Sequence, residues 1–272
     1  ALVAGRAGPP VNRLYCAGLP ATAVQLAPAL VNHGHFTSLQ VRNGAVQGLD
    51  LHLRRLQAGT VELFATSLDE GYVRRSMTGA LQHAGVADAS LRVTVFAPDF
   101  DFRDPLARVA VEVLVAVSAP VALDGPRRVC SVAYQRELAG LKHVGTFGLF
   151  QQRRAAMAAG FDDALFVDAA GHVSEGTTWN LAVHDGQRLV WPQAAALRGT
   201  AEALLRAGWP REQVQRPVAR TELARMQAAF ACNASGIWPL SAIDGHLLPG
   251  SQALAQQGRA VLAQAPWQPL AG

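Results

Sequence analysis

Lys142 is the residue with the clearest chemical meaning, because it is the only lysine among 24 basic residues and all the others are arginines. Arginine serves as well as lysine where only positive charge or solubility is needed. A guanidinium stays protonated and cannot condense with an aldehyde, whereas an amine can lose its proton and attack a carbonyl group. The count indicates a reactive amine. A biased composition that leaves one surface lysine is the alternative, and the count alone does not separate the two readings.

Three further blocks carry residue types suited to binding charged groups. Arg55, in the run His52-Leu53-Arg54-Arg55-Leu56, offers a planar fork of donors that matches a phosphate, although a helix-surface arginine paired with an acid is the alternative. The run Leu197-Arg198-Gly199-Thr200-Ala201 precedes an expected helix, whose first backbone amides can bind an anion; a glycine helix cap without ligand is the alternative. Glu175 taken alone is a strand-end acid beside a turn, an ordinary solvated position.

The order of these blocks resembles the class IV aminotransferases, the fold-type IV pyridoxal-phosphate enzymes, which include branched-chain and D-amino-acid aminotransferases and aminodeoxychorismate lyase. The resemblance covers the chain from about residue 34 to residue 250. It rests on five blocks in the right order: Gly34-His35-Phe36-Thr37-Ser38, residues 52–56, Leu141-Lys142-His143, residues 171–181, and Leu197-Arg198-Gly199-Thr200 leading on to Cys232-Asn233-Ala234. The resemblance implies pyridoxal 5'-phosphate as the cofactor, a small-molecule substrate with an amino group, and a homodimer whose interface helps to close the pocket.

The resemblance also implies roles for three residues at the reactive end of the cofactor. Lys142 would hold the cofactor as a Schiff base and, once substrate displaces it, move the proton at the substrate carbon. Glu175 would face the pyridine nitrogen and keep it protonated, so that the ring can accept electrons. The peptide stretch 176–179 would lie against one face of the ring, and Asn180 would fix this loop by hydrogen bonding.

At the phosphate end, the family's His-x-x-Arg-Leu pattern assigns the phosphate-binding arginine to Arg55 and not to Arg54. Gly199 would let the backbone approach the phosphate, and Thr200 and Ala201 would contribute amides at a helix N-terminus. Many relatives have Gly-Ile-Thr-Arg here, whereas this chain has Gly-Thr-Ala-Glu. The hydroxyl is therefore one place early and the arginine is missing, so we expect the amides to carry more of the phosphate binding.

A second departure lies five residues after the lysine, where many aminotransferases of this group have a tyrosine that contacts the phenolic oxygen of the cofactor. This chain has Phe147, whose ring cannot donate that hydrogen bond. The substitution argues against a conventional branched-chain aminotransferase.

Three blocks favour the aminodeoxychorismate lyase branch: Phe36-Thr37-Ser38, which resembles its Phe-Thr-Thr, Leu141-Lys142-His143, and Cys232-Asn233-Ala234. That branch releases pyruvate and 4-aminobenzoate, a step of folate biosynthesis. Thr37, Ser38 and Asn233 are then candidates on the substrate side, with core packing or turn formation as their alternative. An amino-acid or amine aminotransferase remains an alternative function, as does a protein of the same fold that binds the cofactor without catalysis.

Composition bears on the remaining classes of function. The net charge is +4 and the pI is about 9.4, but the arginines are scattered and few aromatics lie among them, so we expect no nucleic-acid partner. No apolar stretch is long enough to span a bilayer and the beginning of the chain has no secretory pattern, so we expect no membrane association. Cys16, Cys130 and Cys232 are widely spaced and lack the spacing of metal ligands, which predicts reduced thiols, a cytoplasmic location and no metal site.

The elements that must position these residues read as an α/β protein of mixed α+β type, with the two-domain fold-type IV architecture of D-amino-acid aminotransferases. Residues 1–118 form an expected N-terminal α/β domain with strands at 36–41, 91–96 and 108–117, a helix that begins at the cap Asp50 and a second helix over residues 69–82. Residues 119–126, which contain Pro120, Gly125 and Pro126, are an expected linker. Residues 127–272 form a C-terminal domain of mixed strands and helices, with turns at Asp168–Gly171, Asp185-Gly186 and Asp244-Gly245.

Overall fold

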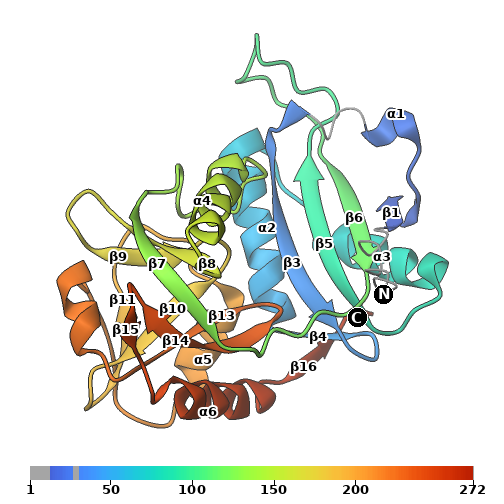
Figure 1. Cartoon of the computed structure of the whole chain (residues 1–272). Coiled ribbons are helices and arrows are strands. Elements are labelled where there is room, and N and C mark those ends of the chain that lie inside the picture. Colours follow the sequence, from blue (N-terminus) through green and yellow to red (C-terminus); the bar gives the residue numbers. More distant parts are fainter. Residues whose placement is uncertain (1–12, 27–30, 272) are drawn as a thin grey trace, which may run out of the picture. The chain divides into compact units, whose positions relative to one another are not determined.

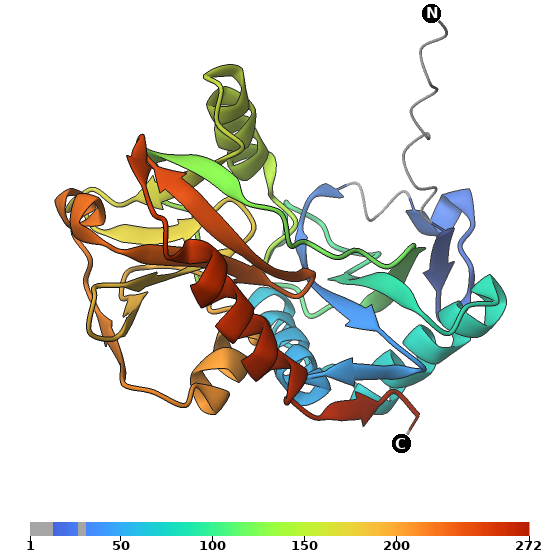
Figure 2. The same cartoon turned by 60° about the horizontal axis from the view of Figure 1, so that its bottom comes forward.

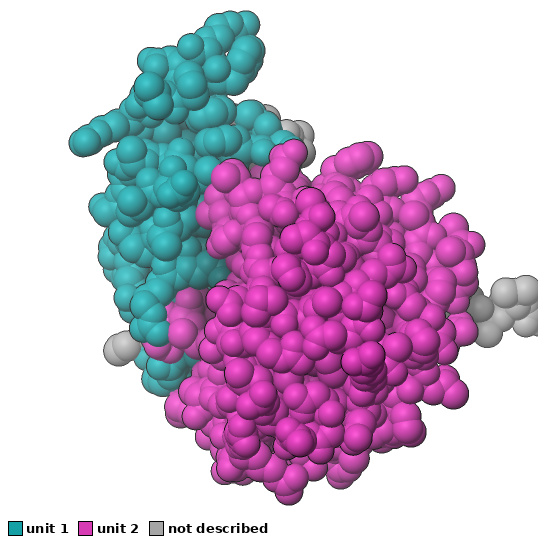
Figure 3. Space-filling view, turned by 90° about the vertical axis from the view of Figure 1, so that its left-hand side faces the viewer, with its two compact units in different colours: residues 1–49, 53–121, 268–272 teal, residues 50–52, 122–267 magenta. Residues whose placement is uncertain are grey.

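The computed structural model describes residues 13–26 and 31–271, and the chain divides into two compact units. Unit 1 comprises residues 1–49, 53–121 and 268–272, and unit 2 comprises residues 50–52 and 122–267; Figure 3 colours them separately. Each unit has its own hydrophobic core, in which helices pack against a sheet. The expected class of mixed α and β structure is confirmed.

Unit 1 is built on a five-stranded sheet in the order β2-β1-β6-β5-β3, in which every pair of neighbours is antiparallel. Residues along β5 and β6 alternate between buried and half-buried, which is the pattern of strands with one face in a core. The sheet strands are β1 (Arg13–Cys16), β2 (Leu19–Pro20), β3 (Gly34–Val41), β5 (Ala89–Phe96) and β6 (Glu112–Ser118). The short strands β4 (Ala45–Gln47) and β16 (Trp267–Pro269) form a separate pair, and α1 spans Ala23–Leu26.

Two helices, α2 (Leu49–Phe64) and α3 (Glu70–Ala84), contribute to the core formed by the buried face of this sheet (Figure 1). The helix expected over residues 69–82 is α3, and Asp69 is its cap, because the carboxylate accepts a hydrogen bond from the amide of Gly71 at 2.9 Å. The prediction that Asp50 caps α2 is wrong. The cap is Gly48, whose φ of 67° is the left-handed conformation that glycine adopts without strain, and Asp50 lies in the first turn instead.

Unit 2 is built on a nine-stranded sheet in the order β12-β11-β10-β13-β14-β7-β8-β9, with β15 paired to β14. The pairs β14–β7, β7–β8 and β11–β12 are parallel, and the other pairs are antiparallel. Strands β8 to β11 are buried almost along their whole length, so both of their faces are covered. The strands are β7 (Arg127–Ala133), β8 (Asp163–Val167), β9 (Val173–Gly176), β10 (Asn180–His184), β11 (Leu189–Pro192), β12 (Gln213–Arg216), β13 (Ala228–Asn233), β14 (Gly236–Ile243) and β15 (His246–Leu247).

Three helices pack on the sheet of unit 2. The long helix α6 (Ser251–Ala263) runs over β13 and β14, as the red helix of Figure 2 shows, and α5 (Thr200–Gly208) packs beside it. Helix α4 (Phe147–Ala158) covers β7 and β8. The segment after β12 contains a 3₁₀ helix, η2 (Arg220–Arg225), which begins where the side chain of Glu222 accepts the amide of Ala219 at 2.8 Å.

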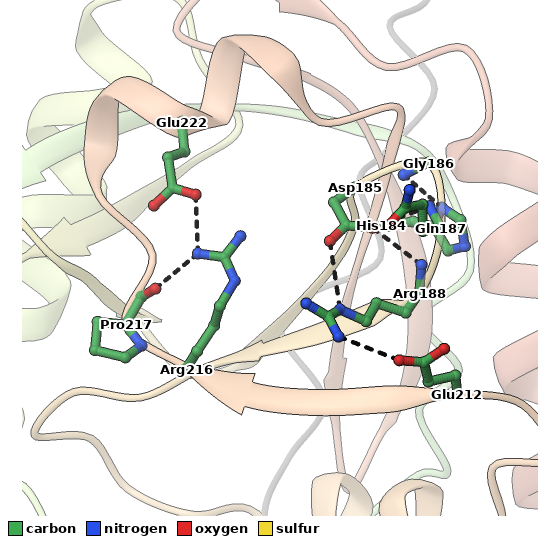
Figure 4. A network of polar contacts seen from close by, with 9 residues as sticks. All are labelled: His184, Asp185, Gly186, Gln187, Arg188, Glu212, Arg216, Pro217 and Glu222. Atoms are coloured by element: carbon green, nitrogen blue, oxygen red, sulfur yellow. Dashed lines mark hydrogen bonds and ion pairs between the residues drawn. The ribbon is translucent and has the colours of Figure 1, made fainter.

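The predicted Asp185-Gly186 hairpin joins β10 to β11, and a network of polar contacts surrounds it (Figure 4). Asp185 accepts the amides of Gln187 at 3.0 Å and of Arg188 at 2.9 Å, and these bonds hold the turn. Arg188 in turn pairs with Glu212 at 3.1 Å. These groups are partly exposed, so we assign this network to the turn and not to chemistry.

Among the residues that the structure describes, no helix has the length and apolar character needed to cross a membrane.

Candidate active site

Lys142 lies in unit 2, in the connection between β7 and α4, and its side chain is half-buried. Two hydrogen bonds hold this connection: Arg136 donates to the carbonyl of Leu141 at 2.6 Å, and the Nε2 atom of His143 lies 3.0 Å from the carbonyl of Glu137. The positive charge of Lys142 acts to lower the pKa of Glu175, so the amine lies within electrostatic range of that carboxylate. The structure thus brings together two of the predicted site residues.

Glu175 is a buried carboxylate near the end of β9, with a residue exposure of 5%. Burial raises its pKa to about 7, and this exceeds the opposing effects of the cations Arg136, Lys142 and Arg198 and of a hydrogen bond from the amide of Leu197. The Oε1 atom is buried and has no hydrogen-bond partner within the described chain. A buried acceptor without a donor is uncommon and calls for an explanation, of which a donor on a bound molecule is one.

Arg136 is a residue of this site that the sequence did not reveal. It is 6% exposed, it is the cation that acts most strongly on Glu175, and its Nε atom has no hydrogen-bond partner in the described residues. Burial lowers its pKa, against the attraction of Glu175 and Tyr134. The only signal in the sequence is its place between a strand and the lysine, and the chain has too many arginines for that place to stand out.

The side chain of Asn180 contacts both the backbone of Leu197 and Gly199. The Nδ2 atom of Asn180, at the start of β10, donates to the carbonyl of Leu197 at 2.7 Å, while the amide of Leu197 donates to Glu175. A methyl group on Gly199 would overlap the Oδ1 atom of Asn180, so only glycine fits at this place. Glu175 and Asn180, the two predicted residues that flank the 176–179 loop, therefore both bind the backbone of one residue, Leu197.

The N-terminus of α5 follows directly. Gly199 is its N-cap, in an extended conformation without a side-chain cap, and Thr200 and Ala201 are buried in the first turn. Free amides at such an end can bind an anion. Glu202, which stands where many relatives have arginine, is 2% exposed and accepts from Arg198 at 3.3 Å, with Arg206 at 3.6 Å.

The buried carboxylate of Glu202 changes the charge of this turn. Burial raises its pKa, while Arg198, Arg206 and the amide of Gly199 lower it. The amide of Gly199 is thus engaged by Glu202, and the amides of Thr200 and Ala201 are the ones that this geometry leaves for an anion.

The remaining predicted cofactor residue, Arg55, lies in unit 1 on α2. Arg55 is half-buried and its neighbour Arg54 is exposed. The NH1 atom of Arg55 donates to the hydroxyl of Thr37, a fully buried residue of β3, at 3.5 Å, and Ser38 is half-buried beside Thr37. The structure therefore joins a predicted phosphate residue to a predicted substrate residue within one unit.

Two other residues singled out in the sequence lie in unit 2. Asn233, at the end of β13, donates to the carbonyl of Thr178 at 3.1 Å and accepts the amide of Ser235 at 2.8 Å, so its side chain fixes a loop. Phe147 begins α4 and is 82% exposed in the single chain. The described residues contain no group of three or more His, Cys, Asp or Glu side chains placed to hold a metal ion.

Comparison with known proteins identifies the family. The family model of amino-transferase class IV matches residues 34–243, and the chain belongs to this family of pyridoxal-phosphate enzymes. No curated protein sequence matches the chain. The chain has the fold of the fold-type IV enzymes, and solved structures with the same fold confirm this assignment.

Three of these solved structures share the fold across nearly the whole chain. The branched-chain amino acid aminotransferase of T.th., complexed with N-(5'-phosphopyridoxyl)-L-glutamate, is 17% identical with a TM-score of 0.80 and covers 94% of this chain and 98% of its own. A hypothetical aminotransferase from Mycobacterium tuberculosis in its PLP-bound form is 20% identical with a TM-score of 0.76, covering 93% and 98%. A putative 4-amino-4-deoxychorismate lyase from Legionella pneumophila is 20% identical with a TM-score of 0.77, covering 88% and 93%.

Proposed function

We propose that this chain is a pyridoxal-phosphate lyase of the 4-amino-4-deoxychorismate lyase type, which releases pyruvate and 4-aminobenzoate. The cofactor assignment is carried by Glu175, whose Oε1 atom is buried and lacks a partner within the described chain. A protonated pyridine nitrogen is a donor that would satisfy this atom. The raised pKa of about 7 for the carboxyl fits the same view, because a cationic ring would supply the charge that the buried carboxylate needs.

The residues of unit 2 suit the other contacts of the cofactor. Lys142 would offer its Nζ atom to the aldehyde, and the amides of Thr200 and Ala201 would bind the phosphate. Arg136 has a buried Nε atom without a partner among the described residues and stands close to Glu175, so it is our candidate to donate a hydrogen bond in place of the tyrosine that Phe147 replaces. The donors and acceptors of these residues therefore suit pyridoxal phosphate, in addition to the support from the family match.

Arg55 would add charge to the phosphate contacts, and its half-buried guanidinium suits that role better than the exposed one of Arg54. The bond of Arg55 to Thr37 would orient the guanidinium. Thr37, Ser38 and Asn233 are the proposed contacts of substrate.

When bound, pyridoxal phosphate supplies an aldehyde for amine exchange and a ring that accepts electrons from the substrate carbon. The protein supplies the rest. The Nζ atom of Lys142 would take the α-proton of the substrate, and Glu175 would hold the proton on the ring nitrogen. In a lyase the carbon–oxygen bond to the cyclohexadiene ring then breaks and pyruvate leaves, whereas in an aminotransferase the proton returns elsewhere and the amino group stays with the cofactor.

Lysine replacement gives the first test of the proposed function. Purified protein mixed with pyridoxal phosphate should show the absorbance band of a lysine-bound cofactor, and Lys142→Ala should lose that band. A protein that fails to bind the cofactor at all would disprove the assignment.

The phosphate contact has a matched control in the neighbouring arginine. We expect Arg55→Ala to raise the Kd for pyridoxal phosphate by about tenfold or more, as loss of a charge-assisted contact does. Arg54→Ala should leave the Kd unchanged, since that side chain is exposed. Equal effects of the two changes would reject the assignment of Arg55.

The alternative function is an amino-acid or amine aminotransferase, and the solved aminotransferases with the same fold support it. Aminodeoxychorismate should yield pyruvate and 4-aminobenzoate if the lyase proposal holds. Turnover of an amino acid with a keto acid, without product from aminodeoxychorismate, would favour the aminotransferase. A bound cofactor without turnover in either assay would favour a non-catalytic binder.

The family likeness also supports a homodimer, and the three widely spaced cysteines, all free thiols in the structure, support a cytoplasmic location. Light scattering on the cofactor-bound protein would measure its mass, and a monomer would contradict this part of the proposal.

A further inference from the structure

Asp163 is the most deeply buried charged group of unit 2, and the chemistry above does not use it. It begins β8 and has an exposed fraction of 0%. An isolated buried carboxylate is costly unless it is hydrogen-bonded and paired with cations. Its partners therefore indicate what the charge is for.

The two oxygens of Asp163 bind one loop. Oδ1 accepts from the hydroxyl of Thr177 at 2.6 Å and from the amide of Ala164 at 2.8 Å, and Oδ2 accepts from the indole Nε1 of Trp179 at 3.1 Å. Thr177 and Trp179 belong to the connection between β9 and β10. A single carboxylate thus grips both ends of a three-residue loop.

Two arginines compensate the charge. Arg127 on β7 and Arg153 on α4 each place a guanidinium nitrogen 3.7 Å from Oδ2 of Asp163. Arg127 also lies over the ring of Trp238, with its Cζ atom 4.6 Å from the centroid, and Trp238 packs edge-on against Trp179. The cluster ties strands β7, β8 and β14 and helix α4 to the loop.

The loop is held from its other sides as well. The amide of Gly176 donates to the carbonyl of Trp179 at 2.8 Å, and Asn233 donates to the carbonyl of Thr178 at 3.1 Å. A methyl group on Gly176 would overlap the Trp179 ring, so the indole lies directly against this backbone. The loop has little freedom to move while Asp163 keeps its two donors.

The residues on either side of the loop shape the proposed cofactor site. Glu175 lies before it, separated from Thr177 by Gly176, Asn180 immediately follows it, and both bind the backbone of Leu197. A shift of the loop would therefore displace the carboxylate that faces the ring nitrogen. Side chains that hold such a group from behind commonly tune its position and basicity.

We propose that Asp163 is a positioning residue of the cofactor site, which fixes residues 177–179 and through them Glu175. The inference rests on the proposed function, because it assigns a purpose to the loop only if pyridoxal phosphate binds beside Glu175. Asp163 touches neither cofactor nor substrate in this account. It acts by holding the loop.

Asp163→Asn separates this role from simple packing. The amide has nearly the shape of the carboxylate, but it has one acceptor oxygen and one donor group. The hydroxyl of Thr177 can reverse its bond, whereas the N–H groups of Ala164 and Trp179 cannot, and these bind different oxygens. In either orientation of the new amide, its NH₂ group therefore points at the N–H of Ala164 or at the N–H of Trp179, and one hydrogen bond is lost.

The experiment titrates pyridoxal phosphate into the full chain and records the Kd and the pH midpoint of the absorbance band. It also records the thermal midpoint of the cofactor-free protein. We expect Asp163→Asn to raise the Kd by about tenfold and to shift the pH midpoint, as loss of a supporting contact does. The matched control is Asp162→Asn, which alters the adjacent exposed carboxylate and should change neither quantity.

A rescue variant sharpens the test. Trp179→Phe removes the indole donor, so in Asp163→Asn/Trp179→Phe the amide can turn its oxygen to Ala164 without conflict, and the Kd and pH midpoint should return part of the way. An unchanged Kd and pH midpoint in Asp163→Asn would overturn the inference, as would a loss of thermal stability alone.

If Asp163→Asn does not fold, Thr177→Val removes one donor to the carboxylate and carries the same expectation. Cofactor binding unchanged in Thr177→Val would overturn the inference. Failure of the unaltered protein to bind pyridoxal phosphate would instead overturn the proposed function, so the two failures are distinguishable.

Discussion

The two units bury polar groups of different kinds. Among the described residues, the buried polar side chains of unit 1 are His35, Thr37, Thr60 and Ser76, and none needs to carry a charge. The buried side chains of Arg136, Asp163, Glu175 and Glu202 all lie in unit 2. Burying a charged side chain costs desolvation free energy, and a hydrophobic side chain could fill the same space without that cost. The difference teaches that buried charge is concentrated in unit 2, which also holds Lys142 and Glu175, and such groups are common where a protein sets up chemistry.

The contrast is tested most strongly at Glu175. Glu175→Gln keeps the shape of the side chain but cannot act as the anion that keeps a ring nitrogen protonated. We expect kcat of the cofactor-loaded protein to fall by about 100-fold or more, because general acid–base and electrostatic groups contribute on that scale. Steady-state kinetics at saturating cofactor would check it, and an effect below about threefold would contradict the role.

The packing beneath the site gives the next largest effect. Gly176→Ala places a methyl group in the Trp179 ring, which is 2% exposed and cannot move aside, so we expect a loss of about 3 kcal/mol of unfolding free energy. Chemical denaturation measures this change.

Gly258→Ala on α6 is the matched control for that substitution. The new methyl group would meet its nearest atoms at ordinary contact distances, 3.5 Å and beyond, and alanine is favoured in a helix by about 1 kcal/mol. Stability should therefore be unchanged or slightly higher. A similar loss in both variants would show that the Trp179 contact is not the cause.

The dependence of unfolding free energy on pH should differ in sign between a buried group of unit 2, Glu175, and one of unit 1, His35. The pKa of Glu175 rises from an ordinary value of 4.5 to about 7 in the folded chain, so the folded state keeps a proton that the unfolded state releases. The contribution of Glu175 to the stability of the cofactor-free protein should then be highest below pH 4.5 and fall as pH rises towards 7, by up to about 3 kcal/mol. The difference in unfolding free energy between the parent and Glu175→Gln isolates this slope, and no slope in the difference would contradict it.

His35 in unit 1 should give the opposite slope. Burial lowers its pKa from 6.5 to about 4, so the unfolded state binds a proton that the folded state refuses. This stability is fully present above pH 6.5 and is lost as pH falls towards 4, again by up to about 3 kcal/mol. His35→Gln can preserve the contact to Thr60, which lies 3.0 Å from Nε2, and should remove the slope. A parent and variant with parallel pH curves would contradict the prediction.

Local signals in the sequence were enough to predict most elements. Asp69 caps a helix and Asp185-Gly186 forms a hairpin, because a short polar side chain and a glycine decide the backbone within a few residues. Asp50 misled for the same local reason: Gly48, two residues earlier, ends the loop in a left-handed conformation and lets the helix begin sooner.

The site was less accessible to such reasoning. Lys142 stood out because it is unique, and Glu175 because its block resembles a family motif. Arg136 and Asp163 are common residue types, and what distinguishes them is burial and contacts with distant segments, such as the bond from Trp179 to Asp163. No spacing along the chain expresses those contacts. The roles of the predicted cofactor and substrate residues stay predictions until the variants are measured.

The backbone of Leu197 links the two ends of the proposed cofactor site. Its amide donates to Glu175 and its carbonyl accepts from Asn180, and α5 begins three residues later, at Thr200. A movement of that helix start is therefore transmitted to the carboxylate, and the reverse holds as well. If the cofactor binds as proposed, its ring nitrogen and its phosphate contact groups that the same segment of the chain positions. A change in binding at one end of the cofactor should therefore alter binding at the other end.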